Sequence, residues 1–313
     1  RVVGAEGASV FSARGLDAWR SASVFATLPE SPMRLSLTSA MQKVTLRRNA
    51  GRWGLERSPP VPADAERVKM LIAALATMRV ERFLDGDAAQ MSGLDAPAAV
   101  VEVSTEIRGG PDEPRRTLVQ VLNIGRAADA AATTIAGTLT AAWADTGDVV
   151  WGPQAFAIPV AQVAELTADE VLYVSRRVIE APAADVGVIQ VCAIEGEASA
   201  PLLEWKRTLD GWEQSGGDVD TADASTEIVA LLTAPSERAD FVGPEGFVQL
   251  GRLVVRTPGG TLVGDVELFM HAEGAIKSGA IAWTRGGGVW RRHTLNASTA
   301  RAIESVRHLT RVE

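Results

Sequence analysis

The chain has 313 residues, of which 46% are hydrophobic and 22% charged, a composition typical of a folded globular protein and not of a disordered or membrane-embedded one. This length is long for a single core and suits two units of about 150 residues each. The printed sequence has no apolar run of about 18 residues, the length that a membrane-spanning helix requires.

Charge is unevenly distributed along the chain. The net charge is −8, but residues 61–274 carry 15 basic and 33 acidic side chains, whereas both ends are basic. Binding to DNA or RNA requires a concentrated positive surface, so this distribution argues against a nucleic-acid partner. The basic amino-terminal part would suit the neighbourhood of anionic lipid.

The single cysteine and the first residue bear on the compartment. Cys192 alone can form neither an intrachain disulfide nor a cysteine-based zinc site, and its alternating apolar surroundings predict a buried small side chain. The sequence begins at Arg1 without a methionine. We therefore expect either a signal peptide or membrane anchor upstream that has been removed, or a chain trimmed for another reason.

The first predicted elements follow an extension at residues 1–32 that carries few structural signals. Met33–Leu37, Val44–Arg48 and Arg52–Glu56 are predicted strands of a meander, and Asn49-Ala50-Gly51 is typical of a tight turn between the last two. A helix capped by Asp64 should follow. Its apolar positions recur at helical spacing and predict one buried face: Val68, Leu71, Ile72, Leu75 and Met78.

The rest of the first half is predicted to be strands and then helices. Strands are expected at Ala98–Ile107, Thr117–Ile124, Ile135–Trp143 and Asp148–Trp151. Pro159 should open a helical stretch. Thr167 and Glu170 have capping-box spacing, so a second helical segment is expected to reach Arg176–Arg177, and a hinge is expected at Ala181–Asp185.

One stretch of the sequence occurs twice, and it predicts the domain organisation. Residues 44–78 are echoed by residues 203–232, so that Trp53 corresponds to Trp212 and Asp64 to Asp223. The second copy should also repeat the order of strands, helix and hairpins. We therefore predict an α+β fold with two tandem repeats, residues 33–180 and 186–313, each a mainly antiparallel twisted sheet with helices packed on it.

The same segments carry a family resemblance. The motif residues are Trp53 followed by prolines and Ala63-Asp64-Ala65, then Ser92-Gly93-Leu94-Asp95-Ala96-Pro97, then Leu122-Asn123-Ile124-Gly125. This pattern resembles a bacterial family known only as domain of unknown function 4340. The resemblance implies an extracytoplasmic, membrane-anchored protein encoded beside ABC-2-type transporters, including gliding-motility-type components. It implies no catalytic residues.

No catalytic or metal-binding signature emerges from the residues themselves. His271 and Glu273 match half of a zinc-deaminase signature, but no downstream cysteine pair follows. Asp218, Asp220 and Asp223 lack the glycine and glutamate of a calcium loop. No nucleophile motif accompanies the histidines. We therefore predict that the protein is not an enzyme and binds no cofactor. We also predict no catalytic, cofactor-binding or metal-binding residues.

The expected function is therefore binding. The first hypothesis is a non-enzymatic extracytoplasmic scaffold subunit, accessory to an ABC-type transporter or envelope complex, that binds protein partners through the loops 87–92 and 108–114. The alternative is a carbohydrate-binding module for envelope glycan, because exposed indole rings stack on sugars. The repeated tryptophans are expected in the core. Trp19, Trp205 and Trp290 are the expected exposed ones.

Overall fold

The structure is a computed structural model, and it describes residues 23–25, 32–58, 60–84, 93–107, 114–164, 166–192, 201–216, 222–236, 238–241, 247–271, 281–286 and 289–294. The chain divides into two compact units. The first contains Arg1–Glu56 and Ala63–Tyr173, and the second contains Arg57–Pro62 and Val174–Glu313. The division after Tyr173 falls earlier in the chain than the predicted hinge at Ala181–Asp185.

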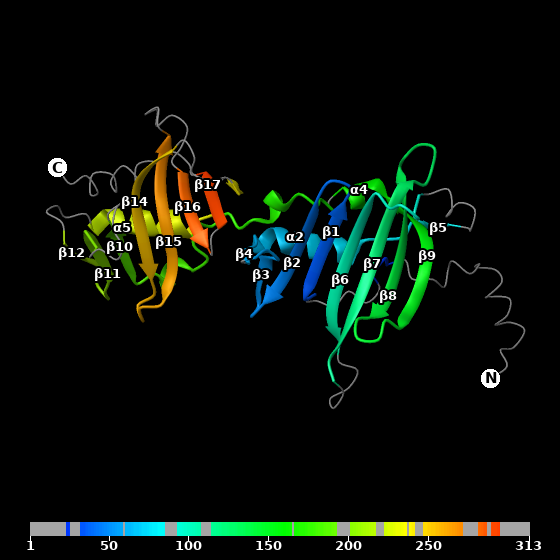
Figure 1. Ribbon diagram of the computed structural model, residues 1–313, viewed down its shortest axis with the longest axis horizontal. Helices are drawn as coiled ribbons and strands as arrows, with labels where there is room; N and C mark the ends of the chain where they lie inside the picture. Colours follow the sequence, from blue (N-terminus) through cyan, green and yellow to red (C-terminus); the bar gives the residue numbers. More distant parts are fainter. Residues whose placement is uncertain are drawn as a thin grey trace, which may run out of the picture. The chain divides into compact units, whose positions relative to one another are not determined.

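The first sheet, built mainly by the first unit, has nine strands in the order β4-β3-β2-β1-β6-β7-β8-β9-β5 (Figure 1). Its pairings are antiparallel, and most neighbouring strands are joined by hairpins. The strands are β1 Arg34–Ser39, β2 Lys43–Asn49, β3 Arg52–Leu55, β4 Val61–Pro62, β5 Arg82–Phe83, β6 Ala99–Ile107, β7 Arg116–Ala127, β8 Thr134–Trp143 and β9 Val149–Pro159.

The predicted meander and its turn are confirmed. Between β2 and β3, Ala50 and Gly51 both have positive φ, at 47° and 81°. Two consecutive positive φ values are what a tight hairpin turn of the primed type requires, because its twist matches that of the strands. The turn therefore fixes the register in which Asn49 faces Arg52.

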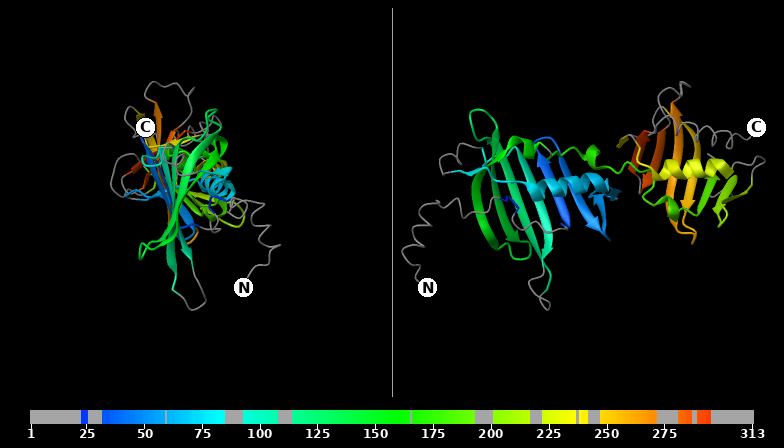
Figure 2. Two further views of the ribbon diagram at one scale, coloured as in Figure 1. Left: turned by 90° about the vertical axis from the view of Figure 1, so that its right-hand side faces the viewer. Right: turned by 180° about the vertical axis from the view of Figure 1, so that it is seen from behind.

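The predicted helix is also confirmed as α2, Ala65–Thr77. The Asp64 side chain accepts hydrogen bonds from the backbone amides of Glu66 and Arg67, and so satisfies amides that the first helical turn leaves without partners. Four of its five predicted apolar positions are buried, whereas Ile72 is half-buried. Figure 2 (right) shows α2 lying across one face of the sheet.

Alternation along the strands separates the two faces of the first sheet. The face under α2 is apolar and buried, with Leu35, Leu46, Val103 and Leu122 all at most 1% exposed. The residues between them point to the other face, which α2 does not cover. We call this second surface the open face of the first unit.

The second unit is an eight-stranded sheet ordered β12-β11-β10-β14-β15-β16-β17-β13. This is the order of the first sheet without an equivalent of β4: three strands in reverse, then four in sequence, then the short strand that follows the helix. The elements are β10 Val188–Cys192, β11 Leu203–Arg207, β12 Trp212–Ser215, α5 Ala222–Thr233, β13 Arg238–Asp240, β14 Phe247–Arg256, β15 Leu262–His271, β16 Ile281–Gly286 and β17 Val289–Thr294.

The fold is mainly antiparallel sheet and richer in strand than the predicted α+β class implies. The predicted helices after Pro159 are wrong in extent, because β9 continues to Pro159 and only short pieces follow: α4 Val160–Val163, η2 Glu170–Tyr173 and η3 Ala183–Asp185. Asp223 is the second residue of α5, not its cap.

One further prediction is wrong, because Cys192 is half-buried and not fully buried. Other predictions fall on residues outside the description. The predicted extension 1–32 is described only at 23–25 and Pro32, and the expected carboxy-terminal helix lies outside the described residues, as do loop 87–92 and most of loop 108–114.

Candidate functional site

The structure describes only some of the residues considered for chemistry. His271 ends β15, and Glu273, Asp218 and Asp220 lie outside the described residues. Asp223 belongs to α5. Within the described part of the chain, no group of three histidine, cysteine or acidic side chains is placed to hold a metal ion.

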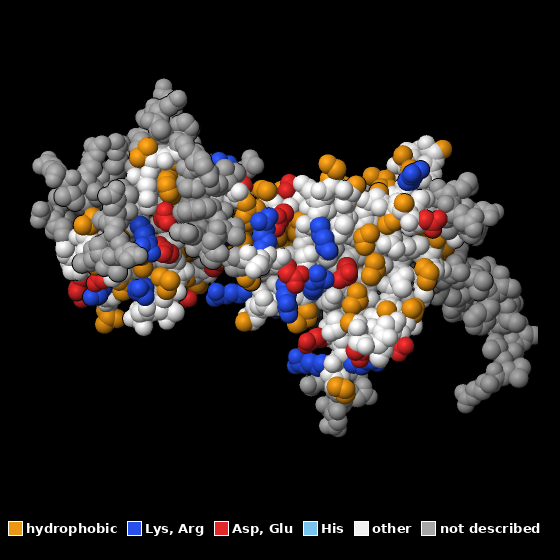
Figure 3. Space-filling view, in the orientation of Figure 1, with side chains coloured by type: hydrophobic (Ala, Val, Ile, Leu, Met, Phe, Trp, Pro, Cys, Tyr) orange, Lys and Arg blue, Asp and Glu red, His pale blue; other side chains and the backbone are white. Residues whose placement is uncertain are grey.

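The most distinctive surface of the first unit is its open face, which has two halves. Figure 3 shows this face, with charged side chains gathered over the part of the sheet around β1 and β2 and hydrophobic ones over the strands that follow. The first half is a polar network on β1, β2 and β6, with Glu56 following β3. Its members are Arg34, Ser36, Thr45, Arg47, Glu56 and Glu102.

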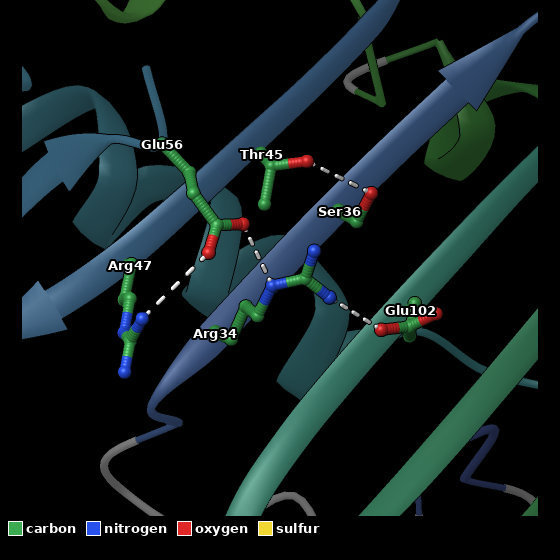
Figure 4. A network of polar contacts seen from close by, with 6 residues as sticks. All are labelled: Arg34, Ser36, Thr45, Arg47, Glu56 and Glu102. Carbon is green, nitrogen blue, oxygen red and sulfur yellow. Dashed lines mark hydrogen bonds and ion pairs between the residues drawn. The ribbon is translucent and has the colours of Figure 1, made fainter. Parts of the chain in front are cut away.

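Arg34 is the centre of this polar network. Its Nε donates to Glu56 at 2.9 Å and its Nη1 to Glu102 at 2.7 Å, so two carboxylates hold one guanidinium (Figure 4). Arg47 lies 3.8 Å from the other oxygen of Glu56. Because each partner fixes the next, the guanidinium of Arg34 has one defined orientation on the sheet.

The polar network contributes little to folding stability. About a third of the side-chain surface of Arg34, Glu56 and Glu102 is exposed, and about 60% of that of Arg47. Exposed ion pairs typically contribute about 0–1 kcal/mol because solvent screens them. Two arginines against two glutamates also leave the network without net charge. The polar network is therefore ordered and charge-balanced, and its small contribution to folding stability does not explain its presence.

The second half of the open face is built from β-branched residues. Val100, Val119, Val121, Thr138 and Thr140 are half-buried on β6, β7 and β8 and alternate with the buried residues under α2. Asn123 is cross-strand from Thr138, with 3.4 Å between its Nδ2 and the threonine Oγ1. Valine and threonine methyl groups form a ridged surface that packs well against another protein surface.

The second sheet also has a face that α5 does not cover, with the residues that alternate with the buried ones, and we call it the open face of the second unit. It differs from the first open face in its ion pairs. Arg252 on β14 makes a bidentate pair with Asp265 on β15, at 2.7 and 2.6 Å. This pairing raises the pKa of Arg252. Glu204 accepts from Lys206 and Gln190, each at 2.7 Å, and these contacts lower its pKa.

Cys192 lies cross-strand from Arg252 on this second open face. Burial raises the pKa of its thiol, so the reactive thiolate is disfavoured. A reactive thiol would need the opposite shift.

The described tryptophans differ in burial from the expectation. Trp205, expected to be exposed, is fully buried under α5, whereas Trp53, Trp143 and Trp212, expected in the core, are half-buried. The guanidinium of Arg116 lies 4.2 Å from the ring centre of Trp143. Trp19 and the side chain of Trp290 lie outside the description.

A buried charged cluster in the second unit was not predicted. Arg291 and His293 on β17 alternate onto the helix side of the sheet and are 8% and 0% exposed. Arg291 Nη1 lies 3.7 Å from the Glu180 carboxylate. Burial, with Arg291 as the next cause, lowers the pKa of His293 to about 3, so His293 is neutral at pH 7.

Comparison with known proteins gives no further guide to the site. No family model, curated protein or solved structure matches this chain. Among the described helices, none is both long and apolar enough to cross a bilayer.

Proposed function

We propose that the protein is a non-enzymatic binding or scaffold subunit that engages a protein partner through the open face of the first unit. The observation that carries the proposal is the pairing, on one sheet face, of an oriented charge-balanced network with a ridge of half-buried valines and threonines. Protein interfaces combine an apolar centre with a polar rim in this way.

The setting that we propose is extracytoplasmic, in a membrane complex such as an ABC-type transporter. It rests on the motif resemblance to domain family 4340, which also implies a membrane anchor upstream of the given chain. We further propose that the two units are tandem repeats. Their common strand order supports this relation, as do the corresponding positions of Trp53 and Trp212 at the start of β3 and β12.

Site-specific photo-cross-linking tests the proposal. A photoreactive amino acid would replace Thr45 or Val121 on the open face, and Met70 on α2 as a matched control, because Met70 is 56% exposed on the opposite side of the sheet. We expect a cross-linked membrane-protein partner from both open-face positions and none from Met70. Cross-links from Met70 alone would overturn the assignment of the face, and turnover in a hydrolase and transferase substrate panel would overturn the non-enzymatic role.

The alternative of an envelope-glycan module rests on Trp143, whose ring is half-buried and so partly accessible. Arg116 lies over this ring, so a sugar would have to displace it. Titration with envelope oligosaccharides should change tryptophan fluorescence if this alternative holds. A Trp143→Phe variant identifies the responding ring, and no response from any glycan removes the alternative.

A further inference from the structure

The buried charged cluster joins a short segment to the end of the second sheet. The docking segment, Arg176–Ala181, contacts the end of α5 and the turn that follows it. The Ile179 amide donates to the Leu232 carbonyl at 3.0 Å, and the Ser236 amide donates to the Arg176 carbonyl at 2.7 Å. The segment is therefore held through its backbone as well as through its side chains.

Apolar packing gives the docking segment a defined seat. Val178 and Ile179 are 1% and 2% exposed and belong to the hydrophobic core of the second unit. A Cβ on Gly264 of β15 would lie only 2.3 Å from the Ile179 Cγ2, so the absent side chain of Gly264 makes room for Ile179. Such close packing depends on the segment lying in one position.

The charged groups at the docking segment make no direct hydrogen bond to each other. Among the described groups, Arg291 Nη1 and Glu180 Oε1 are buried and make no hydrogen bond, and the 3.7 Å between them is longer than a direct hydrogen bond. Burial consequently lowers the pKa of Arg291, against the effect of Glu180. The single negative charge of Glu180 balances the single positive charge of Arg291, so the pair has no net negative charge to offset a further cation.

His293 lies beside this pair. Its ring is hydrogen-bonded to the backbone of Arg176 in the docking segment. From β16 and β13 it is faced by Ala282 and Ala239, neither of which carries charge. Asp240 on β13, next to Ala239, alternates to the other side of the sheet and is held there by Arg292 at 2.9 and 2.6 Å.

We propose that the buried charged cluster is an acid-sensitive latch, in which protonation of His293 releases Arg176–Ala181 from the second sheet. Protonated His293 would place a second positive charge next to Arg291, whose one counter-charge among the described residues is Glu180. Burying an uncompensated charge is costly. The least costly response is local opening of the segment, which exposes both cations to water.

The direction and range of the pH effect follow from linkage. The pKa of His293 is about 3 in the docked state and about 6.5 in an exposed state. His293 therefore binds a proton more readily when the segment is released, so docking is at full strength above pH 6.5 and weakens as the pH falls toward 3. One proton changes the docking equilibrium up to tenfold per pH unit, or about 100-fold at pH 4.5.

Hydrogen exchange of the full chain tests the latch at pH 7.5 and 4.5, with exchange times corrected for the intrinsic rate. We expect amides of the docking segment, Ile179 above all, to lose up to about 100-fold in protection at pH 4.5. Amides of α2 in the first unit serve as the internal reference and should keep theirs. Unchanged protection of the docking segment would overturn the proposal.

Two variants separate His293 from Glu180 as the titrating group. His293→Gln cannot acquire the charge, so the pH dependence should disappear. Glu180→Gln should already loosen the segment at pH 7.5 and still respond to acid. If Glu180→Gln loses the response, Glu180 protonation is the cause and the proposal fails. Should His293→Gln not fold, NMR titration of the native chain decides: one of its three histidines must titrate far below pH 6.5.

Discussion

The two units have the same strand order but fill the far end of their sheets differently. In the first unit, β9 places Phe156 and Ile158 on the helix side, and both are buried. In the second, β17 places Arg291 and His293 at the corresponding end, equally buried. The same strand order and helix placement are thus compatible with either apolar or charged side chains buried at this end of the sheet. The charged side chains distinguish the second unit.

The largest test of this comparison replaces a tryptophan in each unit. Trp205→Ala should lower the free energy of unfolding by about 3–5 kcal/mol, because its indole is fully buried under α5. Trp53→Ala should lose about half as much, since Trp53 is half-buried. Denaturant unfolding measures both losses. Hydrogen exchange should show the loosening only in the unit that carries the change, and uniform loosening would mean that the units unfold as one.

The elements that were predictable are those whose causes are local. The primed turn at Ala50-Gly51 and the Asp64 cap depend on residues within a few positions of each other, and both are confirmed. The extent of β9 was not predictable, because prolines usually end strands. Here β9 pairs on one side with only the two-residue β5, and the register shifts between Gln154 and Trp151, so Pro153 is not required to donate.

The open-face network and the buried cluster depend on long-range pairing. Alternation along each strand does not show that Arg34 and Glu102 share a face. That follows only when β1 is known to pair with β6. The contact between Glu180 and Arg291 requires a segment far away in the sequence to fold onto β17. Nothing in either local pattern indicates such a partner, so these residues were missed.

The next largest effect is expected when the charged filling is broken on one side. Glu180→Leu should destabilise the second unit by about 3 kcal/mol, because it leaves the buried Arg291 without its counter-charge. The double variant Glu180→Leu with Arg291→Met imitates the apolar filling of the first unit and should restore most of this loss. Denaturant midpoints provide the comparison. A double variant as unstable as the single one would show that the pair has no shared role.

A smaller difference is expected at two glycines. Gly264→Ala should cost about 1–3 kcal/mol, because the new Cβ would meet the branched Ile179 side chain at 2.3 Å. Gly137→Ala in the first unit should cost less, since its nearest contact is the ring edge of Phe156 at 2.9 Å. Thermal unfolding of the two variants should rank them in this order. Equal midpoints would mean that the docking segment can shift to accommodate the methyl group.

The smallest effect on stability is expected at the open face, where the comparison becomes functional. Arg34→Gln should change the free energy of unfolding by less than about 1 kcal/mol, because its ion pairs are partly exposed and screened. Arg252→Gln on the second open face is the matched control, with side-chain exposure of 43% against 33% for Arg34. If the first open face binds the partner, Arg34→Gln should reduce photo-cross-linking from Val121, and Arg252→Gln should not. Stability changes this small cannot account for a selective loss of cross-linking, so a loss in Arg34→Gln alone would identify the first open face as the binding surface. Equal reduction by both variants, or by neither, would remove the distinction between the two faces.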